Sequence, residues 1–272
     1  MNSVRQAAVA GSWYPGAATR LAATVDRYLA GAGADSMPRL RAIVSPHAGL
    51  MYSGPVAAYA YKAARDARYD TIVLVGPSHF VPFHGVSIWP RGAWQTPFGD
   101  VRVDELLADA IAAGSQGIVV DRPDAHAREH SLELQLPFVA HVWPTARIVP
   151  LVMGQQTRET AFALGSAVAG AVVGGEVLLV ASSDLSHYED ARTAASLDGV
   201  VMEHVRALDP EGLMRALEHE PRHACGGGPI VSVLHAARQL GGAHARVLQY
   251  ADSGDVSGDK SSVVGYMAAA VW

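Results

Sequence analysis

The chain has 272 residues, of which 50% are hydrophobic and 17% are charged, and its formal net charge at pH 7 is −5. This composition supports a folded domain with a large core and excludes a disordered chain. The acidic balance argues against a general nucleic-acid binder, which usually presents a basic face. A single cysteine, Cys225, excludes an internal disulfide. It is typical of a reducing compartment, so we expect a cytoplasmic protein.

Neither a secretory signal nor a membrane span is expected. The first residues, MNSVRQAAVAGSWYPG, lack the apolar segment of a signal peptide. Residues 161–180 approach transmembrane length with Glu176 as the one charged residue, but Gly174 and Gly175 divide them. We interpret this segment as a helix, a glycine stop and a buried strand.

Apolar runs and helical patterns alternate along the chain. In chain order, the sequence predicts a helix over 17–30, a strand over 42–45, a helix over 56–67 with Pro55 in its first turn, strands over 71–75 and 85–89, a loop over 89–99, a helix over 103–113, a strand over 118–120, a helix over 130–141, a strand over 147–153, a helix over 159–173, a strand over 177–181, helices over 191–207, 211–218 and 226–240, and strands over 244–250 and 262–270. This alternation indicates an α/β fold with a largely parallel central sheet flanked by helices. We expect residues 1–272 to form a single domain.

Polar side chains follow three of the predicted strands. His47 follows the first strand, His79 follows the run TIVLVGPS, and Asp184 and His187 follow the strand over 177–181. Ligands of open α/β sheets bind outside the carboxyl ends of the strands. Any one of these histidines alone is most simply a hydrogen-bonded loop residue. Together they predict a shared site for a divalent metal, since two histidines and one further ligand leave coordination positions open.

Two further stretches contain candidate site residues. Cys225 precedes three glycines and a helix, where a thiolate is favoured; the alternative is a small buried hydrophobe. In EHSLELQLPF, Glu129 is a candidate ligand, a carboxylate that orients a ligand, or a helix-start carboxylate. His130 is a candidate proton carrier, and we interpret Glu133 as a first-turn charge near a helix dipole. The histidines outside these motifs are interpreted as surface or structural residues.

Aromatic residues near these motifs are candidates for a pocket wall, with core packing as the alternative. They are Trp13, Tyr14, Tyr52 and Phe80. Neither a GxSxG elbow nor a dinucleotide fingerprint after a strand is present, and one cysteine cannot form a CxxC zinc site. Serine hydrolase, nicotinamide enzyme and zinc-finger interpretations are therefore excluded.

Several motifs together resemble the Memo-like family. They are, in order, GSWYPG, SPHAGLMYSGPVAAYAY, VLVGPSHF, WQTPFGD, EHSLELQLPF, SSDLSHY, ACGGGP and YADSGDVSGDKSSVVGY. The resemblance implies the fold of class III extradiol (LigB-type) dioxygenases, which open aromatic rings with non-haem Fe(II). It also implies one metal ion per chain, Fe(II) or copper, with His47, His79 and Cys225 as ligands. Asp184 and His187 would stand beside the metal, with His187 in the acid–base position.

We weigh three functions for such a site. The first is a metal-dependent, dioxygenase-like oxidoreductase acting on a small molecule, for which an aromatic compound is a candidate. There His187, Asp184 and His130 would be catalytic, and Trp13 and Tyr52 would contact the substrate. The second is a non-enzymatic, metal-handling or phosphopeptide-binding protein, and the third is hydrolysis by a zinc-bound water. The family resemblance also suggests a radical-SAM protein as a partner, and neither nucleic acid nor membrane is expected as one.

Overall fold

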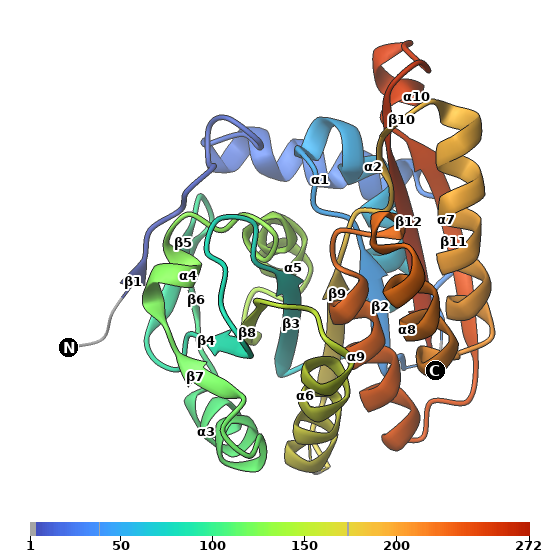
Figure 1. Ribbon diagram of the computed structural model, residues 1–272. Helices are drawn as coiled ribbons and strands as arrows, with labels where there is room; N and C mark the ends of the chain where they lie inside the picture. Colours follow the sequence, from blue (N-terminus) through green and yellow to red (C-terminus); the bar gives the residue numbers. More distant parts are fainter. Residues whose placement is uncertain (1–3, 38, 173) are drawn as a thin grey trace.

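The computed structural model describes residues 4–37, 39–172 and 174–272 (Figure 1). Its strands are β1 (Val4–Arg5), β2 (Ala42–Ser45), β3 (Thr71–Pro77), β4 (Val86–Ile88), β5 (Ala93–Thr96), β6 (Gly99–Arg102), β7 (Val119–Asp121), β8 (Arg147–Met153), β9 (Val177–Ser182), β10 (His187–Glu189), β11 (Ala245–Asp252) and β12 (Val263–Val271). Its helices are α1 (Ala18–Gly31), α2 (Leu50–Ala64), α3 (Glu105–Gly114), α4 (Pro123–Ala127), η1 (Glu133–Gln135), α5 (Leu136–Val142), α6 (Arg158–Ala171), α7 (Ala191–Arg206), α8 (Pro210–His219), η2 (Pro221–His223), α9 (Gly227–Gln239) and α10 (Gly254–Ser257).

Among the described residues, nine strands form the central sheet in the order β10-β12-β2-β9-β3-β8-β4-β7, with β11 paired to β12. The four strands in the middle, β2, β9, β3 and β8, are all parallel to their neighbours in this group. The predicted α/β fold with a parallel centre is therefore confirmed. Antiparallel pairs of β12 with β2 and of β4 with β8 extend the sheet on both sides, which makes it a mixed sheet.

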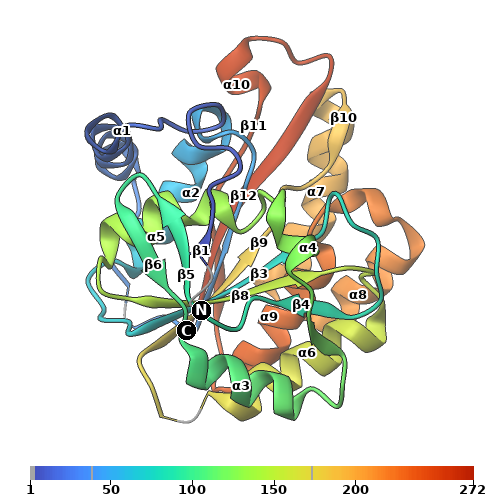
Figure 2. The same ribbon diagram turned by 90° about the vertical axis from the view of Figure 1, so that its left-hand side faces the viewer.

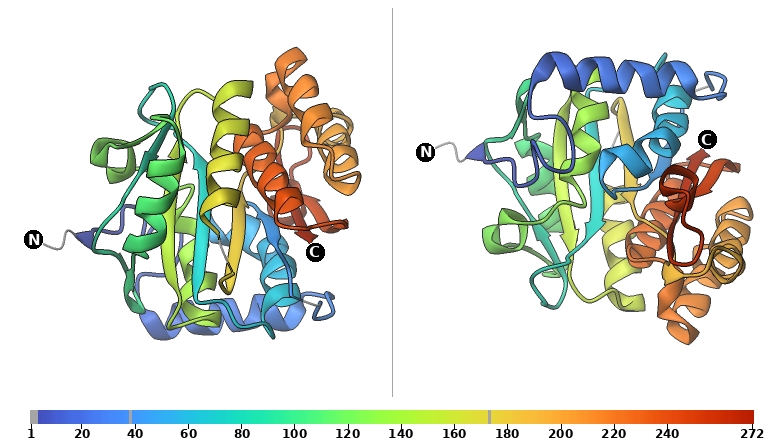
Figure 3. Two further views of the ribbon diagram at one scale, coloured as in Figure 1. Left: turned by 90° about the horizontal axis from the view of Figure 1, so that it is seen from below. Right: turned by 90° about the horizontal axis from the view of Figure 1, so that it is seen from above.

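Helices cover both faces of this sheet (Figures 2 and 3). Helices α1, α2 and α5 contact one another on one face, and α3, α6 and α9 form the layer on the other. Because both faces are covered, the central strands carry apolar residues continuously; all seven residues of β3 are buried. The segment of near-transmembrane length contains α6 and β9, as predicted. Within the described ranges, no helix combines the length and the apolar character needed to cross a bilayer.

Three predictions of local structure were wrong. The helix predicted over 130–141 is present only as the single turn η1 followed by α5, Leu136–Val142. Residues 89–99, predicted as a loop, contain β5, which pairs with β6 across a tight turn and with β1 in a separate three-stranded sheet. Helix α2 begins at Leu50 and not at residue 56, so Pro55 lies inside the helix and not in its first turn. The first N–H groups of a helix have no acceptor within the helix. Here the backbone N–H of Leu50 donates to the carbonyl of Trp13 at 2.8 Å, and this long-range hydrogen bond supports the early start of the helix.

The central strands bring the candidate residues to one edge. His47, His79 and Asp184 each lie two positions after the end of their strand, β2, β3 and β9 respectively. Ser45 and Ser182, the last residues of β2 and β9, are register partners, so the segments that follow both strands start side by side. The sequence prediction of polar groups at neighbouring strand ends therefore corresponds to the observed topology.

Candidate metal centre

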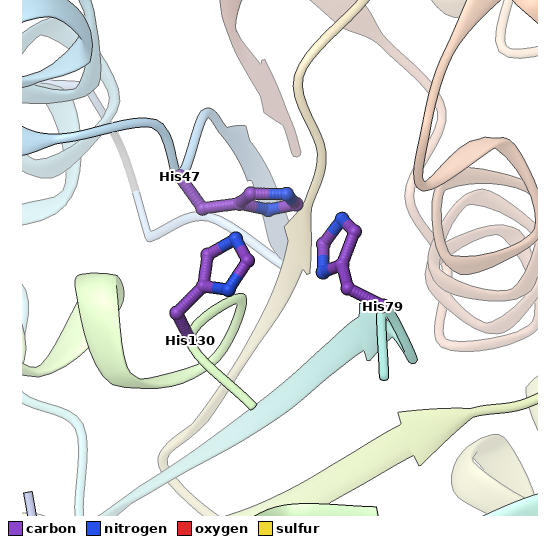
Figure 4. A group of neighbouring side chains, drawn as sticks. All are labelled: His47, His79 and His130. Carbon is purple, nitrogen blue, oxygen red and sulfur yellow. The ribbon is translucent and has the colours of Figure 1, made fainter. Parts of the chain in front are cut away.

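Three histidines converge at the carboxyl ends of β2 and β3. The possible ligand atoms of His47, His79 and His130 all lie within 4.8 Å of one another, and the three rings point toward a common space (Figure 4). The rings of His79 and His130 are stacked, with centroids 4.5 Å apart, and His47 stands nearly perpendicular to both. This cluster could hold a metal ion, and it includes two of the residues predicted as ligands.

The tautomer of His47 follows from the hydrogen-bond network. The hydroxyl of Ser182 donates its one hydrogen to the carbonyl of Ser131 at 2.6 Å. Its oxygen must therefore accept the proton on Nδ1 of His47, 2.9 Å away, as it accepts one from the Gln135 amide at 2.7 Å. With Nδ1 protonated, Nε2 of His47 presents a lone pair, which is what a metal ligand requires.

His79 is held by a charged partner. Its Nδ1 donates to the Glu129 carboxylate at 2.8 Å, which leaves the lone pair on Nε2. Burial alone would raise the pKa of the Glu129 carboxyl, but the hydrogen bonds that His79 and Ser131 donate to it outweigh burial and lower the pKa to about 2. The carboxylate is thus ionised at neutral pH and fixes the His79 ring in the orientation typical of carboxylate–histidine–metal triads.

His47 and His130 stay neutral at physiological pH. Burial, followed by the nearby charge of His79, lowers the pKa of His47 well below its ordinary value. Burial, followed by the charge of His47, lowers the pKa of His130 to about 4. Neutral imidazoles can donate lone pairs, so the chemistry of this donor set fits a divalent transition metal.

Cys225 contacts this cluster from the N-terminal side of α9. Its Sγ lies 3.3 Å from Nε2 of His47 and 3.5 Å from the carbonyl of Asp184. In the described part of the chain, it is not one of the three residues whose ligand atoms mutually lie within 4.8 Å. Burial raises the pKa of the Cys225 thiol, so a metal bound through Sγ would displace the thiol proton. Its assignment as a ligand stays a prediction.

Asp184 and His187 both follow β9, and among the described contacts only Asp184 is hydrogen-bonded to the segment that carries His47. The Asp184 carboxylate accepts the backbone N–H groups of His47 at 2.7 Å and of Ala48 at 3.2 Å, so it holds the loop that carries His47. Burial raises the pKa of Asp184, against the lowering effect of these hydrogen bonds. His187 begins β10, and its Nδ1 donates to the Leu185 carbonyl at 2.8 Å, which leaves Nε2 as a proton acceptor. Their catalytic roles remain untested predictions.

The predicted aromatic residues have different environments. Trp13 lies over His130 with ring centroids 4.4 Å apart and is 39% exposed. Phe80 is 47% exposed and lies 5.8 Å from the same ring. Tyr52 is partly buried and packs against the core, and Tyr14 is buried. Trp13 and Phe80 therefore form an accessible aromatic wall at His130, whereas the substrate role of Tyr52 stays a prediction.

Several residues that support the site were missed or misread in the sequence. Glu133, interpreted as a first-turn charge, does begin η1, but its carboxylate is fully buried and binds the N-terminal segment. Ser182 and Gln135, which set the tautomer of His47, were not singled out. For Ser182 the sequence did contain a signal: a polar residue ends an otherwise apolar buried strand, and buried polar groups need hydrogen-bond partners.

A half-open cavity of about 570 Å³ lies at the carboxyl end of β8, and Cys225 forms part of its wall. Apolar side chains of α8, Met214 and Leu217, line it together with Gln156, whose amide donates to the Cys225 carbonyl at 2.7 Å. The volume is in the range of small-molecule sites. A ligand in this cavity would contact the residue that also touches His47.

Comparisons with known proteins agree with this fold. The family model described as Memo-like protein matches residues 5–270. MEMO1 family proteins of Methanothermobacter thermautotrophicus and Methanosarcina acetivorans are 39% and 42% identical, and each match covers 97% of this chain and 98% of the relative. The crystal structure of an uncharacterized protein from Escherichia coli K12 aligns with a TM-score of 0.57, covering 84% of this chain and 99% of the other. At 17% identity, this last likeness shows the fold alone.

Proposed function

Because this chain belongs to the Memo-like protein family, we propose that it is a metal-dependent oxidoreductase that uses one Fe(II) or copper ion on a small-molecule substrate. The observation that supports this most directly is the cluster of three histidines at the strand ends. Two of them, His47 and His79, have Nδ1 hydrogen-bonded and a lone pair on Nε2, as metal ligands do. Such a site with a thiolate suits iron or copper.

In this proposal His47, His79 and Cys225 are the ligands. The 3.3 Å between Sγ of Cys225 and Nε2 of His47 is compatible with two atoms that bind one ion. Bound there, Fe(II) or copper would supply redox chemistry with O₂ and Lewis acidity. The chain itself would position the substrate against Trp13 and Phe80 and exchange protons with it.

His130 is proposed as the residue that takes up the proton. Its Nδ1 lies 3.7 Å from the Glu129 carboxylate, beyond hydrogen-bond distance, and no hydrogen bond to its ring nitrogens is found within the described residues. The ring therefore keeps either nitrogen available for a proton. His187, with Nε2 free, is the second proton carrier, and Asp184 orients the His47 loop.

A phosphopeptide-binding function has weaker support. Of the three cations near the motifs, Arg222 already pairs with Glu189 and Glu220, and Lys260 pairs with Asp252 and Asp255. Arg128 lies over the Phe80 ring at 5.1 Å. Recognition of a phosphate group usually recruits free arginines. A metal-handling role without catalysis is distinguished by the experiment below, and the cytoplasmic location and radical-SAM partner remain predictions.

The proposal is tested by measuring the metal content of protein purified without oxygen. We expect close to one iron or copper per chain in the wild type, retention in the His219→Ala control at the exposed end of α8, and loss in His47→Ala and His79→Ala. Cys225→Ala should also lose the metal, whereas His130→Ala should keep it and lose oxygen uptake. The reverse result for these two variants would make His130 the third ligand.

Two other results would change the functional conclusion. Zinc in the same site would favour hydrolysis by a metal-bound water over oxidation. Bound iron or copper without oxygen uptake on any small molecule would favour metal handling. A wild-type protein that neither retains nor regains metal would contradict the proposal.

A further inference from the structure

The Glu129 carboxylate accepts four hydrogen bonds from the two segments that carry His79 and His130. Its Oε2 accepts the backbone N–H of His79 at 2.6 Å, and its Oε1 accepts Nδ1–H of His79 at 2.8 Å. The same Oε1 accepts the backbone N–H groups of His130 at 2.9 Å and Ser131 at 2.8 Å. One buried carboxylate thus binds the loop after β3 to the loop before η1, and two of the three clustered histidines are attached to it.

We infer that Glu129 is the positioning residue of the metal site, and that it makes His79 a stronger donor to the metal than His47. The inference rests on the proposed function for the metal itself. It adds an assignment to a residue that would touch neither the metal nor the substrate. Glu129 acts through His79, whose ring it orients, and through the His130 backbone, whose distance from His79 it fixes.

The partner of His47 is of a different kind. Nδ1–H of His47 donates to the neutral hydroxyl of Ser182, which also accepts from the amide of Gln135. That amide oxygen in turn accepts the hydroxyl of buried Tyr61 at 2.9 Å. All the side chains in this series of hydrogen bonds are uncharged, so the series fixes the His47 ring without placing a negative charge next to it. A carboxylate on Nδ1 increases the basicity of a ligating imidazole, whereas a hydroxyl does so much less.

Unequal partners give the two ligands different roles. His79 is paired with the Glu129 carboxylate and is exposed beyond the carboxyl end of β3. It would be the stronger electron-pair donor to the metal and would lower the effective charge of the ion. His47, fully enclosed and paired with a hydroxyl, defines the geometry from the side of Cys225. Removing the charge of Glu129 should therefore affect metal affinity more than it affects the fold, since an isosteric amide can still accept some of the same hydrogen bonds.

The inference is tested with Glu129→Gln, with Glu159→Gln in the exposed first turn of α6 as the matched control. Apparent affinity for Co(II), used as the probe ion, is measured by chelator competition, and the visible absorption of bound Co(II) reports the donor strength. We expect about 10- to 100-fold weaker binding for Glu129→Gln, a shifted Co(II) spectrum, and wild-type behaviour for the control. Equal affinity and an unchanged spectrum would overturn the inference while leaving the proposed function intact, because the wild type would still bind metal.

A second measurement does not depend on whether the variant folds. Long-range ¹H–¹⁵N spectra of the metal-free wild type give the tautomer of each histidine. Both His47 and His79 should carry the proton on Nδ1, and the Nδ1 proton of His79 should resonate further downfield because its acceptor is charged. A proton on Nε2 of His79, or equal shifts for the two histidines, would rule out the role assigned to Glu129. A wild type that binds no Co(II) would overturn both this inference and the proposed function.

Discussion

Replacing Glu133 with alanine is expected to lower the free energy of unfolding by about 3–5 kcal/mol, because it leaves a buried guanidinium without its counter-charge. Arg5 is 2% exposed and Glu133 is 0% exposed, and Nη1 of Arg5 lies 2.6 Å from the carboxylate. The same carboxylate accepts the backbone N–H groups of Ala8 and Val9 and the hydroxyl of Tyr14. The loss is measured by urea unfolding at pH 7.

Two matched variants separate the charge from the hydrogen bonds. Tyr14→Phe removes one hydrogen bond to Glu133 and should cost only about 1 kcal/mol. The double variant Arg5→Met with Glu133→Leu removes both charges and should be more stable than Glu133→Ala, since an apolar pair avoids the buried unpaired ion. If the free energy of unfolding of Glu133→Ala is within about 1 kcal/mol of the wild-type value, the ion pair of Arg5 and Glu133 does not hold the N-terminal segment.

This ion pair matters for the site because of what the N-terminal segment covers. Trp13 lies over His130 and its carbonyl accepts the first N–H of α2. Glu133 anchors the residues that precede Trp13, so its loss should free the aromatic ring at His130 as well as destabilise the fold. The buried carboxylate therefore connects stability to the shape of the substrate side of the pocket.

The sequence was sufficient for what depends on neighbours along the chain. The run TIVLV and the strand over 147–153 are apolar after their first residue, and both form central strands. The positions of His47 and His79 followed from where such strands end. Their convergence followed from the parallel arrangement, which brings the carboxyl ends of strands to one edge.

What could not be predicted depends on contacts between distant segments. Arg5 meets Glu133 across 128 positions of sequence, and a local pattern shows Glu133 as a helix-start charge. The start of α2 depends on the carbonyl of Trp13. The hairpin of β5 and β6 is short and rich in polar residues, and a sheet forms there because β1 adds a third strand. None of these contacts can be predicted from the local sequence, because each partner lies far away along the chain.

The same limit applies within the site. Sequence spacing places a histidine at a strand end, but its tautomer depends on the atom that meets Nδ1. For His47 this atom belongs to Ser182, 135 positions away, and for His79 it belongs to Glu129, 50 positions away. Those partners determine which nitrogen faces a metal, and they appear only when the loops have been brought together.

Acid should destabilise the protein partly through His126, an effect that is independent of the metal centre. His126 is 0% exposed, it packs between Trp89 and Trp94, and neither ring nitrogen has a hydrogen-bond partner among the described residues. Burial, followed by the charge of Arg5, lowers the pKa of His126 from 6.5 to about 3. A proton on this ring would be buried next to the charge of Arg5, so the folded state takes it up only at much lower pH than the unfolded chain.

The sign and size of the effect follow from proton linkage. Between pH 6.5 and 3 the unfolded chain binds a proton at His126 that the folded protein does not, so stability falls as the pH falls through this window. At pH 4.5 this lowers the free energy of unfolding by about 2.7 kcal/mol, at about 1.4 kcal/mol per pH unit.

The effect is measured by urea unfolding of the wild type and of His126→Phe at pH 7 and at pH 4.5. Between these two pH values, the free energy of unfolding of the wild type should fall by this amount more than that of His126→Phe. Since His47 and His130 also have lowered pKa values and destabilise in the same direction, only the difference between the two proteins reports on His126. Equal pH dependence of the unfolding free energy for both proteins would contradict this prediction, because it would mean that the folded protein binds a proton at His126 as readily as the unfolded chain does.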